Sequence, residues 1–180
     1  MAATQQTEAT RKRLREAEFF WHRLSTVDRP TVISREPEAP EFYLNAFVSA
    51  ARSVEWVLQK ERPDDWDAWI TGWKAQLSDQ DNAVRRYFVD QRNKIAKEGA
   101  PDLTFTVTPV SLMEFMQQAS LQGASVQIYP GVPGTPPPTY TMLEKSLTDH
   151  PGRTLSAACQ PFLELTRRLV DDFEREHPPT

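Results

Sequence analysis

The sequence predicts a mainly α-helical protein, a bundle of four to five helices with a small β-element at about 103–143 inserted before the last helix. Over most of the chain, apolar residues recur every three or four positions, which is the period of a helix that buries one face. From Leu103 onward the period becomes two, because Leu103, Phe105 and Val107 alternate with threonines. Such alternation is typical of a strand with one apolar face.

The length and composition indicate a single domain over 1–180. Of the 180 residues, 39% are hydrophobic and 26% are charged, which is the composition of a globular chain that can bury a core. Residues 1–7 and 177–180 are short polar or proline-rich ends, and we expect them to be disordered tails.

The first four helices are bounded by recognisable start and stop signals. They are predicted at about 8–26, 41–61, 64–77 and 79–98, with an extended, proline-interrupted connection at 27–40. Pro63 ends the second helix. Ser78 followed by Asp81 is a typical helix start, and Gly99 followed by Pro101 is a typical helix stop.

The segment after Val107 is less clear-cut. Ser111 and Glu114 have the spacing of a helix cap, which predicts a short helix, although a strand continuing past Pro109 is the alternative. Further strands are predicted at 125–129 and 139–143, with a Pro/Gly-rich loop at 130–138 between them. The last helix reaches about residue 176, and Pro161 inside it predicts a kink or a late start.

Several features point to a cytoplasmic protein. The single cysteine, Cys159, excludes an intrachain disulfide and lies on the apolar face of the last helix, so we expect it to be buried and inert. No stretch approaches the ~20 apolar residues of a membrane span, and the N-terminus lacks the apolar segment of a secretory signal. The net charge of −4 argues against a generic basic nucleic-acid binder, but it allows a local basic groove.

Neither a metal nor a cofactor is expected. The sequence contains none of the usual nucleotide-binding, metalloprotease or nucleophile motifs. Three histidines and one cysteine are also too few for a zinc site of the usual ligand types.

The fourth helix carries the most informative polar residues. Steps of four from Val84 reach Arg92, which predicts a guanidinium on the buried or partner-facing stripe, where its charge needs a counterpart. Asn93 adds an amide that donates and accepts hydrogen bonds, and Lys97 adds positive charge. Arg92 has two alternative roles: an ion pair within the chain, for instance with Glu55, or the lining of a polar cleft or dimer seam.

The second helix offers a matching polar set. Asn45, Ser49 and Arg52 fall on one side at helical spacing, and Glu55 follows on the next turn. Together with Arg92 and Asn93 of the fourth helix, these residues are candidates for binding a ligand. The alternative is a solvated face with a weak Arg52–Glu55 pair.

The third helix carries Trp66, Trp69 and Trp73 on one side. Tryptophans at helical spacing usually anchor a core or an interface, and less often stack on a ligand. We therefore treat the three as a candidate interface as well as candidate core residues.

The region at about 41–99 resembles the helical core of HEPN-like proteins of prokaryotes. The similarity lies in FYLNAFVSAARSVEWVLQKE, the tryptophan-rich helix and AVRRYFVDQRNKIAKEG. The resemblance implies a helical bundle that dimerises, and active members are metal-independent RNases or act in toxin–antitoxin and defence systems. The motif of those members is an arginine, a polar residue directly after it and then a histidine, with four to six residues between the arginine and the histidine.

The motif is degenerate in this chain. Arg92 and Asn93 match its start, but the positions allowed for the histidine hold Lys97, Glu98 and Gly99. A histidine titrates near neutral pH and suits acid–base chemistry, whereas the ordinary pKa of a lysine is too high for a base. Arg15 and His22 form a second formal match, which we attribute to the chance pattern of an amphipathic helix.

These observations lead to one leading hypothesis and two alternatives. The leading hypothesis is a non-catalytic, HEPN-like binding module that forms a homodimer through the second and fourth helices and contacts RNA or a nucleotide at Arg92 and Asn93. The first alternative is an active metal-independent RNase that uses Arg92, Asn93 and Lys97. The second is a structural or immunity-type protein that binds a protein partner through its tryptophans.

Overall fold

The structure is a computed structural model that describes residues 7–28, 38–121 and 140–178. The elements in these ranges are α1 (Glu8–Val27), α2 (Ala39–Glu61), α3 (Pro63–Ala75), α4 (Asp79–Glu98), β1 (Leu103–Val110), α5 (Leu112–Leu121), β2 (Tyr140–Leu147) and α6 (Leu155–Glu176). This order confirms the predicted class, a mainly α-helical fold with a β-element before the last helix. The short helix α5 is the element for which the sequence also allowed a strand.

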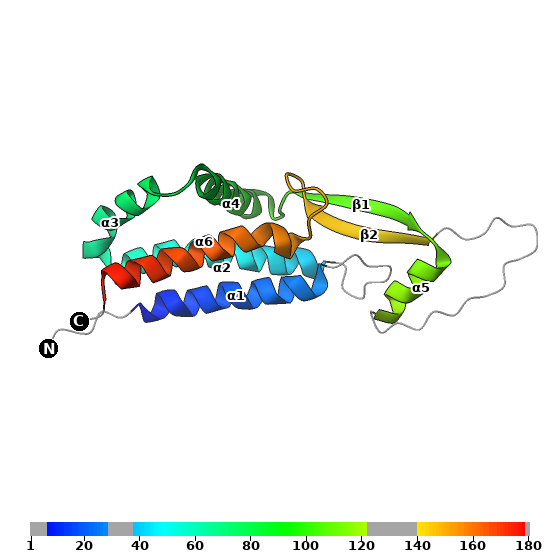
Figure 1. The fold of residues 1–180 in the computed structure, drawn as a ribbon, viewed down its shortest axis with the longest axis horizontal. Coiled ribbons are helices and arrows are strands. Elements are labelled where there is room, and N and C mark those ends of the chain that lie inside the picture. Colours follow the sequence, from blue (N-terminus) through cyan, green and yellow to red (C-terminus); the bar gives the residue numbers. More distant parts are fainter. Residues whose placement is uncertain (1–6, 29–37, 122–139, 179–180) are drawn as a thin grey trace, which may run out of the picture.

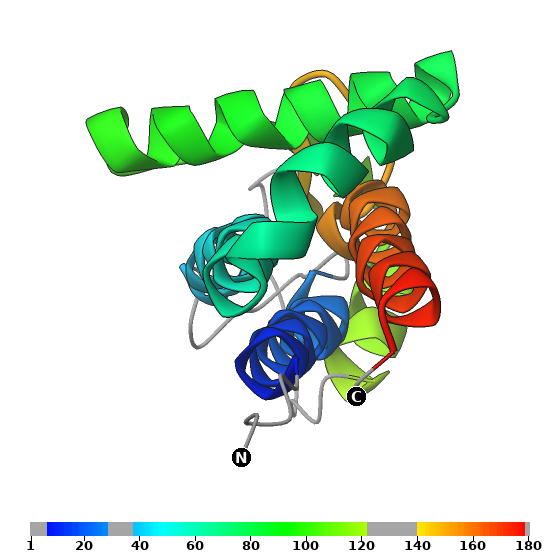
Figure 2. The same ribbon diagram turned by 90° about the vertical axis from the view of Figure 1, so that its left-hand side faces the viewer.

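The bundle is built on α1, α2 and α6, which lie side by side, while α4 lies across α2 and α6 (Figures 1 and 2). The largest fully buried side chains of the main core come from all of these helices and from the end of β2. They are Leu24, Leu44, Phe47, Val48, Val54, Phe88, Leu147, Leu155, Leu163 and Val170.

Aromatic stacking fixes α4 on this core. The Phe88 ring stacks on the Phe162 ring of α6, with 4.5 Å between ring centroids, and meets Phe47 of α2 edge-on at 6.4 Å. Such pairs add stabilisation beyond the area they bury. Phe88 therefore sets which face of α4 points inward.

The predicted helix ends are largely confirmed. The Ser78 hydroxyl accepts a hydrogen bond from the Asp81 N–H at 3.1 Å, and Gly99 adopts the left-handed conformation with φ 80°. A residue with a side chain is strained at that φ, which explains why a glycine ends α4. α6 begins at Leu155, before Pro161, so the late start is wrong and the proline lies inside the helix.

Several predicted segments lie outside the described residues. They are residues 1–6 and 179–180 of the tails, residues 29–37 of the connection, and the strand at 125–129 with the loop at 130–138 in the β-element. Residues 7, 177 and 178 of the predicted tails are described, and the first two of them contact α6. The Thr7 hydroxyl donates a hydrogen bond to the Glu174 carboxylate, and the His177 ring stacks on Phe173 at 4.6 Å.

β1, α5 and β2 form an arm that extends from one end of the bundle (Figure 1). β1 and β2 pair antiparallel, from Leu103 opposite Leu147 at the base to Val110 opposite Tyr140 near the far end. α5 contacts β2, where the Phe115 ring lies 4.8 Å from the Tyr140 ring.

The base of the arm is fastened to α4 through Asp102. Its N–H donates to Gln91 Oε1 at 3.3 Å, and its carboxylate accepts from Lys94 Nζ at 2.5 Å and from the Thr148 hydroxyl at 3.1 Å. Leu147 is buried in the main core. Within the described ranges, these contacts hold the arm to the bundle at its base.

Among the described helices, none combines the length and the apolar character that a membrane crossing requires.

Candidate functional site

Glu55 on α2 is the centre of a charged cluster that joins three helices. Its carboxylate accepts from Lys74 Nζ of α3 at 2.8 Å, from Arg85 of α4 at 3.1 and 3.2 Å, and from Arg52 of α2 at 3.3 Å. The sequence suggested Glu55 as a partner of Arg92, but Arg85 occupies that place. The side chain of Glu55 is 20% exposed, so this side of α2 is not a fully solvated face.

The charges of this cluster do not balance. Burial by itself raises the pKa of Glu55, but the hydrogen bond from Lys74 and the charges of Arg85 and Lys74 outweigh it, so the pKa falls below its ordinary value. Burial lowers the pKa of Arg52; Glu55 counteracts this shift, whereas the charges of Arg85 and Arg92 add to it. One carboxylate thus faces three cations, which leaves a local excess of positive charge.

A small cleft opens beside the cluster, between α2, α3, α4 and α6. Its lining residues are Ala51, Arg52, Glu55, Trp73, Arg85, Phe162, Leu165, Thr166 and Leu169. The cavity volume is about 20 Å³, which is room for about one water molecule. A nucleotide does not fit into a cavity of this size.

Arg92 does not lie on the buried stripe that the sequence predicted. The inward side of α4 is formed by Val84, Phe88, Gln91 and Ile95, whereas Arg92 is exposed. Each residue turns an α-helix by about 100°, so Gln91 and Arg92 lie on either side of Phe88, about 60° and about 40° from it. The packing of α4 turns the Gln91 side inward, where Gln91 is buried. The C-terminal end of α4 also extends past the bundle, which exposes more of its surface (Figure 2).

The other candidate residues of α4 and α2 are not brought together in a groove. Asn93 and Lys97 are exposed on the same end of α4 as Arg92. Ser49 is exposed, and Asn45 is half-buried, with a buried Oδ1 that has no hydrogen-bond partner among the described residues. Of the predicted ligand-binding set, only Arg52 and Glu55 line the cleft.

The tryptophans of α3 face inward, which is the core position that the sequence allowed as the alternative to a partner interface. Trp66, Trp69 and Trp73 are 4%, 9% and 8% exposed, and they pack on α6 and on Leu58 of α2. Trp69 Nε1 donates to Glu176 and Trp73 Nε1 to Asp172 of α6, both at 2.9 Å. These hydrogen bonds give the two indole N–H groups acceptors within the chain, and they hold α3 against α6.

The remaining candidates show no catalytic arrangement within the described ranges. Arg15 and His22 are both exposed on α1. Cys159 is fully buried, as predicted, and burial followed by the charge of Asp28 raises the pKa of its thiol well above the ordinary value. No group of three or more potential metal ligands occurs among the described residues.

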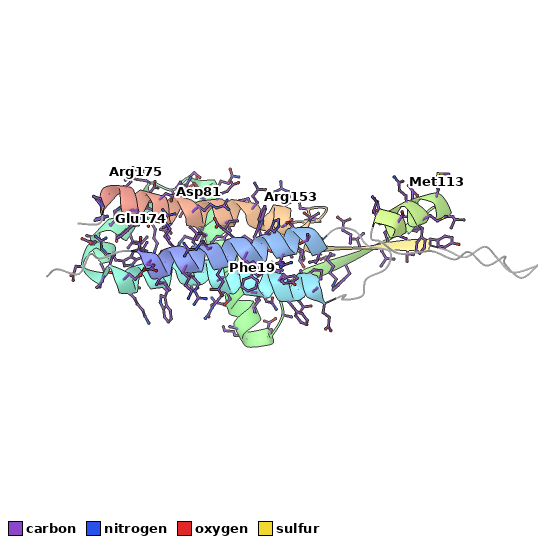
Figure 3. All side chains as sticks on the ribbon, turned by 90° about the horizontal axis from the view of Figure 1, so that it is seen from below. Phe19, Asp81, Met113, Arg153, Glu174 and Arg175 are labelled. Atoms are coloured by element: carbon purple, nitrogen blue, oxygen red, sulfur yellow. The ribbon has the colours of Figure 1, made fainter. Side chains whose placement is uncertain are left out.

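The arm carries an apolar surface that the sequence did not reveal. Its exposed large apolar residues are Phe105, Val107, Leu112, Met113, Met116 and Leu121, of which Met113 is 80% exposed. Figure 3 shows Met113 on the side of α5 that points away from the strands. The alternation in β1 predicted one apolar face, but only the tertiary arrangement shows that the bundle does not cover it.

Comparison with known families corrects the resemblance stated above. The family model of bacteriophage lambda protein ea47 matches residues 3–158. The match includes the whole of 41–99, the region that suggested a HEPN-like protein, so that assignment is wrong. No curated protein and no solved structure matches this chain. Because the match spans most of the chain, the protein belongs to the bacteriophage lambda ea47 family.

Proposed function

We propose that this protein is a non-catalytic interaction module that binds a protein partner through its arm. The observation that carries the proposal is the position of the exposed apolar side chains. On β1, Phe105 is 55% and Val107 is 60% exposed, and on α5, Met113 and Leu121 are 80% and 75% exposed. Exposed apolar side chains gathered on one part of a chain often mark a protein-binding site.

The construction of α5 supports the same proposal. Ala119 is fully buried and Phe115 packs on Tyr140, so one side of the helix already faces the strands. Met113 and Met116 lie on the surface, and methionine is flexible enough to fit an irregular partner surface. The two strands that the structure describes form a narrow sheet, so a partner that covers the arm would stabilise it.

The ionisable groups of the described residues favour binding over catalysis. Glu55 is engaged by three cations, and the pKa of Cys159 is raised rather than lowered as a nucleophile requires. The cavity beside Glu55 holds about one water molecule. These features support a structural role for the charged cluster.

Photo-crosslinking from the arm tests the proposal. A photoreactive amino acid is placed at Met113, and in a second protein at Arg153, which is exposed at the end of the bundle (Figure 3). Both proteins are irradiated in the cells in which the chain is normally made. We expect a discrete protein adduct from position 113 and none from position 153, because most of the exposed large apolar side chains of the described residues lie on the arm; those of the bundle are Phe19, Phe42 and Trp56.

The result that contradicts the proposal is equally specific. If position 113 and further arm positions, such as Leu121, give no adduct while bundle positions do, the partner binds elsewhere. The mass of an adduct also identifies its origin, because a second copy of the chain doubles the mass.

RNA contact is a second candidate function, supported by the excess of positive charge around Glu55. Arg52, Lys74 and Arg85 surround one carboxylate, and Arg92 lies close enough to Arg52 to lower its pKa. A cationic surface of this kind attracts phosphate groups, and the resulting affinity falls as salt rises.

RNA binding can be measured by fluorescence anisotropy with single-stranded RNA at increasing salt. We expect Arg92→Gln to weaken binding several-fold, and Arg153→Gln to leave it unchanged. An affinity that is equal in all three proteins would rule out this surface as the RNA site.

A further inference from the structure

We propose that the indole of Trp56 is a stacking surface for a base of single-stranded RNA, whose phosphates bind to the neighbouring cations Arg52, Arg85 and Arg92. This inference rests on RNA contact, the second candidate function above. It adds the residue that contacts a base, and it predicts that an unpaired strand is preferred to a duplex.

The exposure of Trp56 on α2 is the first observation. Trp56 is 67% exposed, whereas Trp66, Trp69 and Trp73 of α3 are at most 9% exposed. A tryptophan side chain carries a large apolar area that usually packs in a core or an interface. Packing within the described chain does not account for this one, and its flat ring is suited to contact the face of another ring.

Trp56 has cations of α2 on both sides. Arg52 comes four residues before it and Lys60 four residues after it, so all three lie on one side of the helix. The Lys60 ammonium lies over the Trp56 ring, 5.0 Å from its centroid, and Arg52 belongs to the charged cluster of Glu55. The flexible stem of Lys60 lets the ammonium leave the ring and bind a phosphate when a base stacks there.

α4 supplies further cations beside this part of α2. Arg85 donates to the Glu55 carboxylate at 3.1 and 3.2 Å. Arg92 follows Arg85 by about two helical turns, so the two lie on the same side of α4, and the charge of Arg92 reaches Arg52. Asp90 lies about 160° around the helix from Arg92, so it does not neutralise this side.

An exposed indole next to these cations favours single-stranded RNA over other polyanions. Cations alone attract the phosphates of any nucleic acid, whatever its bases. Stacking of a base on an aromatic side chain adds affinity that does not depend on the sequence of the strand. The bases of a duplex stack on one another, so only an unpaired base can lie on Trp56.

Binding to strands with and without bases tests the inference. Fluorescence anisotropy compares a single-stranded RNA with an abasic strand of the same length, which keeps the phosphates and lacks the bases. We expect the wild-type chain to bind the RNA about five-fold or more tightly, the lower end of what stacking of one base contributes. Trp56→Ala should lose this preference and bind the abasic strand as the wild type does, whereas Arg92→Gln should weaken the binding of both strands.

Phe19→Ala is the matched control. Phe19 on α1 is 51% exposed and has the Arg23 guanidinium over its ring at 5.1 Å, as Trp56 has Lys60. Because α1 supplies none of the cations that contact Glu55, this substitution should leave both affinities unchanged. Circular dichroism should show the same helical content in all of these proteins.

Tryptophan fluorescence gives a second readout that a purely structural role of Trp56 would not change. A base stacked on the indole should quench the emission of the wild-type chain as RNA is added. Trp56→Phe keeps an aromatic ring, so it should still prefer the RNA to the abasic strand. It should nevertheless lose most of the quenching, because the three tryptophans of α3 are buried.

Three outcomes overturn the inference: equal affinity of the wild-type chain for both strands, tighter binding of a duplex, or unchanged RNA binding by Trp56→Ala. If Arg92→Gln still weakens binding in such a case, the cationic surface remains an RNA site and only the stacking on Trp56 fails. A chain that binds no RNA but binds vesicles of anionic lipid would overturn RNA contact as well. Failure of this inference is thus distinguishable from failure of the candidate function on which it rests.

Discussion

Glu55 holds together cations from α2, α3 and α4, and its removal has a predictable cost. In Glu55→Gln the three cations lose their carboxylate while remaining half-buried, so we expect the free energy of unfolding to fall by about 2 kcal/mol. Urea denaturation measures this change. Glu98→Gln, on the exposed end of α4, should change it by less than about 0.5 kcal/mol.

The same residue predicts a dependence on pH. The pKa of Glu55 is lower in the folded chain than its ordinary value of 4.5. The stability that the carboxylate contributes is therefore present above pH 4.5 and is lost as pH falls through the lower, folded value. We expect the difference between wild type and Glu55→Gln to shrink below that pH. A difference that stays constant at acid pH would show that ionisation of Glu55 is not its source.

Alanine substitutions of Trp69 and Trp56 compare the loss of a buried tryptophan with the loss of an exposed one. Trp69 is 9% exposed and lies 5.0 Å from the Phe173 ring, whereas Trp56 on α2 is 67% exposed. Trp69→Ala should lower the free energy of unfolding by about 3–5 kcal/mol, because it leaves a cavity under α3. Trp56→Ala should cost less than about 1 kcal/mol in the same urea titration. Similar losses for both would contradict the assignment of α3 to the core.

At the scale of elements, the sequence predicted the helices better than the arm. α1, α2, α3 and α4 lie within two residues of their predicted bounds, because helical period, Ser78 and Gly99 are local signals. The predicted place of Arg92 on the buried stripe of α4 is wrong because a step of four residues gives the inward face only roughly. The ring of Phe88, stacked on Phe162, decides which neighbouring positions of α4 are buried.

We expect that the contacts of Asp102 at the base of the arm can be weakened without unfolding the bundle. Asp102→Asn removes the charge that Lys94 faces and weakens the contact with Thr148. We expect faster amide hydrogen exchange in β1 and β2, and unchanged exchange in the buried parts of α1, α2 and α6. Asp90→Asn, on the exposed side of α4, is the control. Faster exchange throughout the chain would instead mean that Asp102 supports the whole fold.

At the scale of the whole molecule, the helices bury most of their apolar surface against one another, while the arm does not. The tryptophans of α3 pack against α6. Phe88 of α4 stacks on Phe162 of α6. Among the described residues, the arm is joined to the bundle at its base, where Leu147 enters the core. This difference is the reason why we propose a binding surface on the arm rather than on the predicted groove of α4.

The sequence by itself determined the helical class, the insertion of a β-element before the last helix and the helix ends, because each depends on periodicity and on residues close together in the chain. It also determined that Cys159 would be buried, since that residue lies on a strongly apolar helix face. Only the tertiary structure decided that Glu55 meets Arg85 instead of Arg92, that the tryptophans face inward and that the arm stays uncovered. Those outcomes depend on which surfaces distant segments bring together, and no local pattern encodes that choice.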